Sequence, residues 1–215
     1  MKVSTVGSHV TLLFHSKYQT FTPAQLIATF QDQGFLQTKG NANISANPLA
    51  PPVPTTIFSK DNLVILFNQN ENLIMFQIIN TLDFNELYEK EIQKILISLN
   101  YNPSSVSLMG IDVLTQIHEV NSPIETLTSL VNKEFVNGLK INEDSIMKVS
   151  SIKLTNDSEK ESLSLDLQPL QTDPNGSYVL AISYKTNEND KFNEFIKEFG
   201  EDMISKIIDE AQKYA

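Results

Sequence analysis

The sequence contains no cysteine and no tryptophan, and all 16 of its basic residues other than histidine are lysines, so it also contains no arginine. Without cysteine, disulfide bonds, thiol nucleophiles and thiolate metal sites are excluded. Arginine is the side chain that best binds phosphate and guanine, and a net charge of -10 repels polyanions, so we expect no nucleic-acid partner. The seven glycines form no Gly-x-Gly cluster, and we therefore expect no nucleotide cofactor.

Long apolar runs are also missing. No stretch approaches the roughly 20 apolar residues of a membrane-spanning helix, and the first residues do not show the apolar run of a secretory signal. We therefore predict a soluble, cytoplasmic protein without membrane contact. With 215 residues, 40% of them hydrophobic, the chain is long enough to bury a full core, and we predict a single compact unit over 1–215.

The first hundred residues predict a long strand, a capped helix, three short strands and a second helix. Between Val3 and His15 apolar and polar residues alternate, as in a strand with one buried face. Thr22 followed by Pro23 favours a helix start, and Gly34 favours its end. Further strands are predicted over 55–59, 63–68 and 73–80, and an amphipathic helix from Asp83 to just before Pro103.

Residues 38–54 are polar, small and rich in proline. We predict an exposed loop that forms neither strand nor helix, and a spacer is its default interpretation. The alternative is a lid or a partner-binding segment around Pro51 and Pro52, because an extended proline-rich chain loses little entropy when it docks.

The second part of the chain repeats this order of elements about a hundred residues later. A long strand is predicted over 105–120, and Ser122 with Pro123 begins a helix that ends at Gly138. Strands are then predicted over 146–155, 162–170 and 178–185, with a turn at 173–176, followed by one helix of about two dozen residues from Asp190.

Individual residues also correspond between the two parts. Gly7 and His15 are eight residues apart, as are Gly110 and His118. Other corresponding pairs are Val10 with Val113, Thr22-Pro23 with Ser122-Pro123, and Gly34-Phe35 with Gly138-Leu139. We therefore predict an internal duplication.

The predicted fold class is α+β, built from two related, ferredoxin-like halves over 1–102 and 103–215. Each half is a strand, a helix, several strands and a helix, with helices covering one face of an antiparallel sheet. The halves are expected to join first strand to first strand, or to pack sheet to sheet, around a pseudo-two-fold axis.

Two segments of the second half resemble a sporadically distributed, uncharacterised prokaryotic protein family. They are Leu108-Met109-Gly110-Ile111-Asp112-Val113 in the long strand, and Val179 to Tyr184 leading into the helix from Phe192 to Ile208. The resemblance implies the same duplicated strand and helix layout. It implies no catalytic residue.

The polar faces of the two long strands are the candidate site. Strand parity places His9 and His15 on one face of the first strand, and Asp112 and His118 on one face of the middle strand. If the strands are related by the duplication, these faces coincide and form a ligand- or partner-binding surface. Close-spaced histidine ligand pairs and a Gly-x-Ser-x-Gly nucleophile motif are both missing, so we predict no metal and no catalytic residue.

The resulting prediction is a non-enzymatic binding or accessory protein that recognises a protein partner or a small ligand at the cleft between the two halves. One alternative is a metal-dependent or acid-base enzyme, which requires His9, Asp112 and His118 to converge. A second alternative is an acidic inhibitor or antitoxin-like partner of a basic protein, with the carboxylates of the last helix as its surface. A homodimer through Phe199 and Met203 is the alternative to a core position for these two residues.

Overall fold

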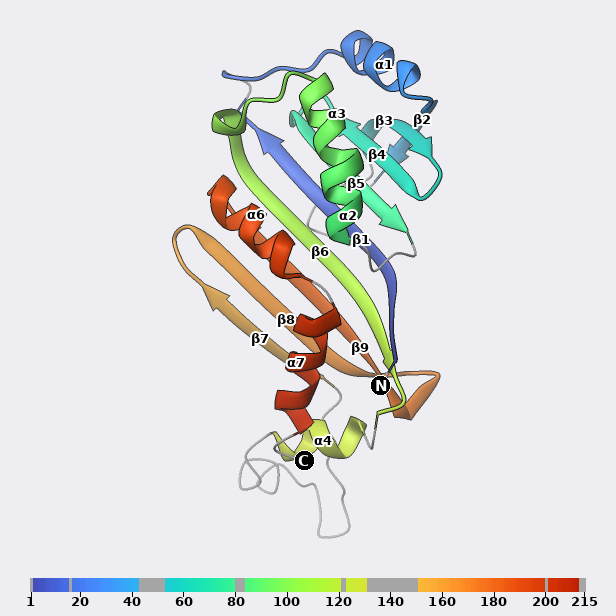
Figure 1. Cartoon of the computed structure of the whole chain (residues 1–215), viewed down its shortest axis with the longest axis vertical. Helices are drawn as coiled ribbons and strands as arrows, with labels where there is room; N and C mark the ends of the chain where they lie inside the picture. The colour runs from blue at the N-terminus through green and yellow to red at the C-terminus, as the bar shows by residue number, and fades with distance from the viewer. Residues whose placement is uncertain are drawn as a thin grey trace.

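The computed structural model describes residues 2–15, 17–42, 53–79, 84–120, 123–130, 151–199 and 201–212. In this part of the chain nine strands form one sheet in the order β2-β3-β4-β5-β1-β6-β9-β8-β7, and every neighbouring pair is antiparallel (Figure 1). The strands are β1 Lys2–Phe14, β2 Leu36–Ala42, β3 Val53–Lys60, β4 Leu63–Asn68, β5 Leu73–Ile79, β6 Val106–His118, β7 Ile152–Asp157, β8 Glu161–Leu170 and β9 Asp173–Thr186.

Short helices connect these strands and follow them. They are α1 Pro23–Asp32, α2 Phe84–Leu87, α3 Gln93–Ser98, α4 Pro123–Ser129, α6 Asn189–Glu198 and α7 Glu201–Gln212. A π-helical turn, Tyr88–Ile92, joins α2 to α3, and a 3-10 turn, Pro103–Ser105, precedes β6. These helices together with the antiparallel sheet confirm the α+β class. Among the described helices, none is long and apolar enough to cross a membrane.

Both parts of the chain fill the sheet in the same order. In the first part β1 lies at the centre of the sheet, and β5, β4, β3 and β2 follow outward. In the second part β6 lies at the centre, and β9, β8 and β7 follow outward on the other side. The two parts meet where β1 pairs with β6 over twelve residue pairs, from Lys2 opposite His118 to Phe14 opposite Val106. Of the two expected joins, the structure has first strand against first strand.

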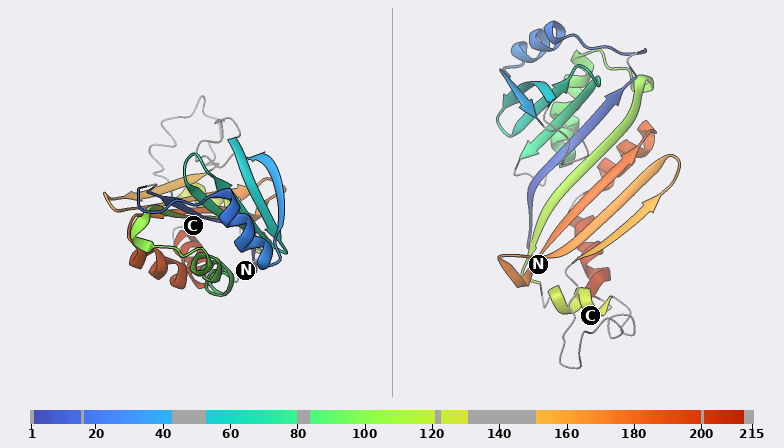
Figure 2. Two further views of the ribbon diagram at one scale, coloured as in Figure 1. Left: turned by 90° about the horizontal axis from the view of Figure 1, so that it is seen from above. Right: turned by 180° about the vertical axis from the view of Figure 1, so that it is seen from behind.

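One face of the sheet forms the main core together with the helices. Val10 on β1 and Ile111 on β6 belong to the same buried cluster as Phe30 of α1, Phe192 of α6 and Ile208 of α7. Alternate residues of β6 are buried on this face, so the intervening ones, including Asp112, point to the opposite face. Figure 2 shows the sheet from its end and from behind.

Three sequence predictions are wrong in detail. The loop predicted over 38–54 is strand at both ends, because β2 extends to Ala42 and β3 begins at Val53; residues 43–52, which include Pro51 and Pro52, lie outside the described part. Pro54 is tolerated because it pairs only with Asn41 of β2, and the ladder between β3 and β4 begins two residues later at Thr56.

The second correction concerns the last helix, which is divided into α6 and α7. Phe199 has an extended backbone, with ψ at 127°, and it precedes Gly200, a residue type that is unfavourable inside helices. Phe199 is also buried, in ring contact with Phe195, so it belongs to the core and not to an exposed contact surface.

The third correction concerns the hairpin between β8 and β9. The sequence predicts its turn at 173–176, whereas the turn lies at Gln171 and Thr172, because Leu170 pairs with Asp173. The register between the two strands then shifts after Pro169, which pairs with Tyr178. The end predicted for the helix that begins at Pro123, and the start predicted for the strand at 146–155, lie outside the described residues.

Candidate functional site

His9 on β1 and Asp112 on β6 are direct cross-strand neighbours. Both side chains are half-buried, and both lie on the face opposite the main core. Directly opposite residues in an antiparallel pair have Cα atoms about 4.5–5.5 Å apart, so the imidazole and the carboxylate are adjacent. The sequence prediction that the polar faces of the two long strands coincide therefore holds at this pair.

Further polar residues continue this row across the sheet. Gln77 of β5 is opposite His9, Ser183 of β9 is opposite Asp112, and Ser164 of β8 is opposite Ser183. Because paired residues share a face, the five side chains line up over five neighbouring strands from both parts of the chain. The row thus crosses the line along which the two parts meet.

The histidine in this row is neutral near pH 7. Burial lowers the pKa of the His9 imidazole below its ordinary value of 6.5, and the nearby Asp112 carboxylate acts in the opposite direction without cancelling this effect. A neutral imidazole has one donor and one acceptor nitrogen. His9 is therefore able to donate one hydrogen bond and to accept another from a bound molecule.

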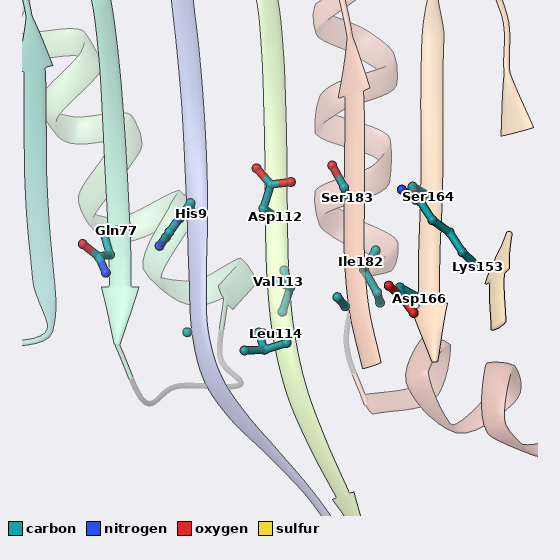
Figure 3. A pocket seen from close by; sticks show the side chains of 12 residues that line it. His9, Gln77, Asp112, Val113, Leu114, Lys153, Ser164, Asp166, Ile182 and Ser183 are labelled. Carbon is teal, nitrogen blue, oxygen red and sulfur yellow. The ribbon is translucent and has the colours of Figure 1, made fainter. Parts of the chain in front are cut away.

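A depression of about 500 Å³ lies over this row. Its lining residues come from β5, β1, β6, β9, β8 and β7, and Figure 3 shows them from close by. Gly7 and Ala181 also line it. Glycine has no side chain and alanine has only a methyl group, so both leave room above the sheet. Leu114, which is 40% exposed, adds an apolar surface. The depression therefore combines a polar row with a small apolar area.

A second row beside the first contains charged residues. Asp166 of β8 is opposite Lys153 of β7, and both side chains line the depression. The Oδ1 atom of Asp166 is buried and has no hydrogen-bond partner among the described residues. A buried acceptor without a partner costs free energy. A ligand that donates a hydrogen bond to Asp166 removes this cost, and its binding is stabilised by the same amount.

The remaining histidines are far from this pair. His118 is six residues from Asp112 along β6, and His15 is six residues from His9, which corresponds to about 20 Å in a strand. His15 is exposed just beyond β1, where its ring contacts Tyr18. The structure therefore brings together His9 and Asp112 but neither His15 nor His118, and the convergence required for a three-ligand site is not present.

His118 has a separate set of contacts. Its Nδ1 lies 3.0 Å from the Ser177 hydroxyl, which donates to Oδ2 of Asp173 at 2.6 Å. The carboxylate contacts the serine and not the histidine, so the order of groups differs from that of a catalytic triad. Ser177 is fully buried, and these contacts link β6 to the start of β9.

The depression offers binding groups without a recognisable catalytic set. Within the described residues no group of three or more histidine or acidic side chains is placed to hold a metal ion. Within the described part of the chain no hydrogen bond joins His9 to a serine, and the histidine–serine contact that is present, His118 with Ser177, lies outside the depression. The arrangement is suited to holding a polar molecule through several hydrogen bonds.

Sequence reasoning missed Gln77, Lys153, Ser164, Asp166 and Ser183. Strand parity was the available signal, since each alternates with apolar residues in its own strand. Parity alone does not say which strands are neighbours, so it does not bring these residues to His9 and Asp112.

Comparison of the sequence with known proteins does not assign the chain to a family. A scan against protein-family models gave no match, and no curated protein matches the sequence.

Proposed function

We propose that this protein is a non-catalytic, intracellular binding protein whose small polar ligand lies in the depression over the junction of β1 and β6, between two related halves. The observation that carries the proposal is the composition of the depression. Its lining comes from β5 and β1 of the first part and from β6, β9, β8 and β7 of the second, with His9 and Asp112 at the centre. A site between repeated units is a common position for a ligand.

The register of the two central strands supports the duplication. Gly110 follows Gly7 by 103 residues, and Val113 follows Val10 by the same interval. If a two-fold axis relates two antiparallel strands with this offset, it must pass between two directly paired residues that are also 103 apart. His9 and Asp112 are such a pair. The offset found in the sequence and the register found in the sheet therefore point to the same axis.

The arrangement of helices on one face of the sheet favours the ferredoxin-like fold predicted for each half. In the end-on view of Figure 2, α3, α6 and α7 lie on one side of the sheet. The polar row of the depression has the opposite parity, so it lies on the face away from these three helices. The resemblance of the second half to an uncharacterised prokaryotic family with a duplicated layout belongs to this proposal as well.

The chemistry of the lining favours a small hydroxylated molecule with one positive charge. The lining contains two carboxylates, Asp112 and Asp166, against one ammonium group, that of Lys153, and the net charge of -10 favours a cation at longer range. Hydroxyl groups of a ligand are able to exchange hydrogen bonds with the neutral polar side chains of the lining, which are Ser164, Ser183, Gln77 and His9. An amino sugar has both features. The Asp166 oxygen, which lacks a partner among the described residues, is the natural acceptor for its ammonium group.

The two alternatives from the sequence gain less support. The enzyme needs His118 beside His9 and Asp112, and His118 instead contacts Ser177 about 20 Å along the strand. The acidic inhibitor needs a surface matched to a basic partner, and no contact among the described residues singles one out.

Three probes of similar size test the proposal: glucosamine, glucose and glucuronate, which differ mainly in charge. Each is titrated into isotopically labelled protein, and the amide chemical shifts are followed by NMR. We expect glucosamine to bind tightest and glucuronate weakest, with shift changes centred on residues of the depression. Shift changes elsewhere, or none with any probe at millimolar concentration, overturn the proposal.

A pair of variants assigns the preference for a cation to the site. Asp166→Asn keeps the size of the side chain and removes its charge, so we expect the advantage of glucosamine over glucose to fall roughly tenfold, given that a hydrogen bond to a charged group contributes about 1.5–3 kcal/mol. Asp32→Asn, at the exposed end of α1, makes the same change of net charge far from the depression and is the control. Equal effects of the two variants contradict the proposed site.

A further inference from the structure

Strand β7 is the last strand of the sheet in the described part of the chain, with only β8 beside it. Residues 153–157 are all exposed, and Leu154 is 60% exposed. The outer side of such a strand presents backbone N–H and C=O groups that are able to pair with another strand. An exposed leucine on an edge strand adds an apolar contact to these groups.

The sequence of β7 is complementary to itself. When a second copy of β7 is placed antiparallel beside the first, with Thr155 opposite Thr155, each Lys153 lies opposite Asp157 of the other copy. Opposite charges and threonine pairs at directly facing positions both stabilise a sheet. One register therefore gives two ion pairs and one threonine pair, related by a two-fold axis.

Leu154 fits the same register. It alternates with Lys153 and Thr155 and so lies on the other face of the sheet. In the register centred on Thr155, the two copies of Leu154 are diagonal neighbours about 7–8 Å apart, which is within reach of long side chains. Association thus removes both exposed leucines from water.

Both charged groups are available for these ion pairs. Asp157 accepts a hydrogen bond from the Ser162 hydroxyl at Oδ1, 2.5 Å away, which leaves Oδ2 for a cation. Lys153 takes part in none of the ion pairs within the described part of the chain. Within the described part of one molecule, the charge complementarity of β7 is therefore not used in ion pairs.

We propose that two copies of this chain associate through β7, antiparallel and centred on Thr155, so that their sheets join across a two-fold axis. The interface is small, and the dimer is of the weak class that forms and dissociates with concentration. The interface shares Lys153 with the lining of the depression, but the dimer needs no ligand, so dimerisation measured without any ligand is distinguishable from binding in the depression.

Substitutions that reverse the charge of Lys153 or Asp157 test both the β7 interface and the register centred on Thr155. Lys153→Asp creates two pairs of facing carboxylates in the dimer, and Asp157→Lys creates two pairs of facing ammonium groups. Replacing two attractions by two repulsions is expected to weaken dimerisation roughly tenfold or more for each variant. Sedimentation equilibrium at several protein concentrations measures the dissociation constant.

A mixture of the two variants is the decisive measurement. In a mixed dimer, one chain carries Lys153→Asp and the other carries Asp157→Lys, so carboxylates face ammonium groups at both contacts. We expect an equimolar mixture of the two proteins to form a heterodimer with nearly the stability of the unmodified dimer. Lys94→Asp, at an exposed position of α3, changes the net charge as Lys153→Asp does and is expected to leave dimerisation unchanged.

Every outcome decides the proposal. Unmodified protein that stays monomeric at high concentration overturns it, as does a dimer that neither single exchange weakens. A mixture that fails to restore association rejects the register centred on Thr155. Circular dichroism of each variant confirms that these exposed substitutions leave the fold intact.

Discussion

His9 faces Asp112 across the two strands where the halves of the sheet meet, and yet burial lowers the pKa of the imidazole. The neighbouring carboxylate favours the protonated form, but the loss of water around the half-buried ring outweighs it. His9 is therefore neutral under conditions in which an exposed histidine begins to take up a proton. This relationship makes both binding and stability depend on pH.

The first prediction concerns the free energy of unfolding as a function of pH. The pKa of His9 is 6.5 when unfolded and lower when folded, so between these values the unfolded state binds more protons. The contribution of His9 is fully present above about pH 6.5 and is lost as the pH falls through the folded-state pKa. Urea unfolding at a series of pH values is expected to show this decrease, and His9→Gln to reduce it. His15→Gln, at an exposed position, is the control. The same decrease in His9→Gln and in unmodified protein contradicts the assignment.

The centre of this sheet was predictable from the sequence because it depends on local periodicity. Alternation in β1 and β6 identified both long strands and their buried faces, and Met109, Ile111, Val113 and Ile117 are all buried as expected. The three strands β3, β4 and β5 were also predicted, over 55–59, 63–68 and 73–80. Periodicity is a strong signal when one face of a strand is buried and the other is not.

The features that depend on distant partners were not predictable in the same way. Pro54 lies in a strand only because β4 does not extend beside it. In sequence His118 corresponds to His15, and its contact with Ser177, 59 residues away, depends on the pairing of β6 with β9. The site residues of β5, β8 and β9 become neighbours only through the strand order.

A second prediction uses the space above Gly7. A Cβ atom there meets only the carbonyl oxygen of Ile78, at 3.8 Å, which is an ordinary contact. The backbone thus accepts a side chain at this position, so we expect Gly7→Val to place two methyl groups in the depression and to abolish binding of glucosamine without lowering the stability by more than about 1 kcal/mol. Gly110→Ala, on β6 outside the lining, is the control. Unchanged binding in Gly7→Val argues against a ligand in the depression.

A third prediction concerns the proton on His118. Ser177 has a single hydroxyl proton and donates it to Asp173, so it accepts its second hydrogen bond from Nδ1 of His118. Nitrogen NMR is expected to show the tautomer with the proton on Nδ1. Ser177→Ala removes both contacts, and we expect it to lower the free energy of unfolding by about 1–3 kcal/mol. Ser164→Ala, at a half-buried position on the neighbouring strand β8, is the control. A proton on Nε2 alone contradicts this assignment.

The last prediction tests whether the two halves unfold together. Phe192 of α6, in the second half, is fully buried, and its ring lies 6.0 Å from Tyr88 of the first half in an edge-to-face arrangement. We expect Phe192→Ala to cost roughly 3–5 kcal/mol and to lower the stability of both halves, because each contributes to the same core. Far-UV circular dichroism and tyrosine fluorescence should then give one coincident transition at a lower urea concentration. Ile97→Ala, at a 76% exposed position on α3, is expected to change the stability by less than about 0.5 kcal/mol. Two separate transitions, with only the second half affected by Phe192→Ala, would show that the halves are independent folding units in spite of the long pairing between β1 and β6.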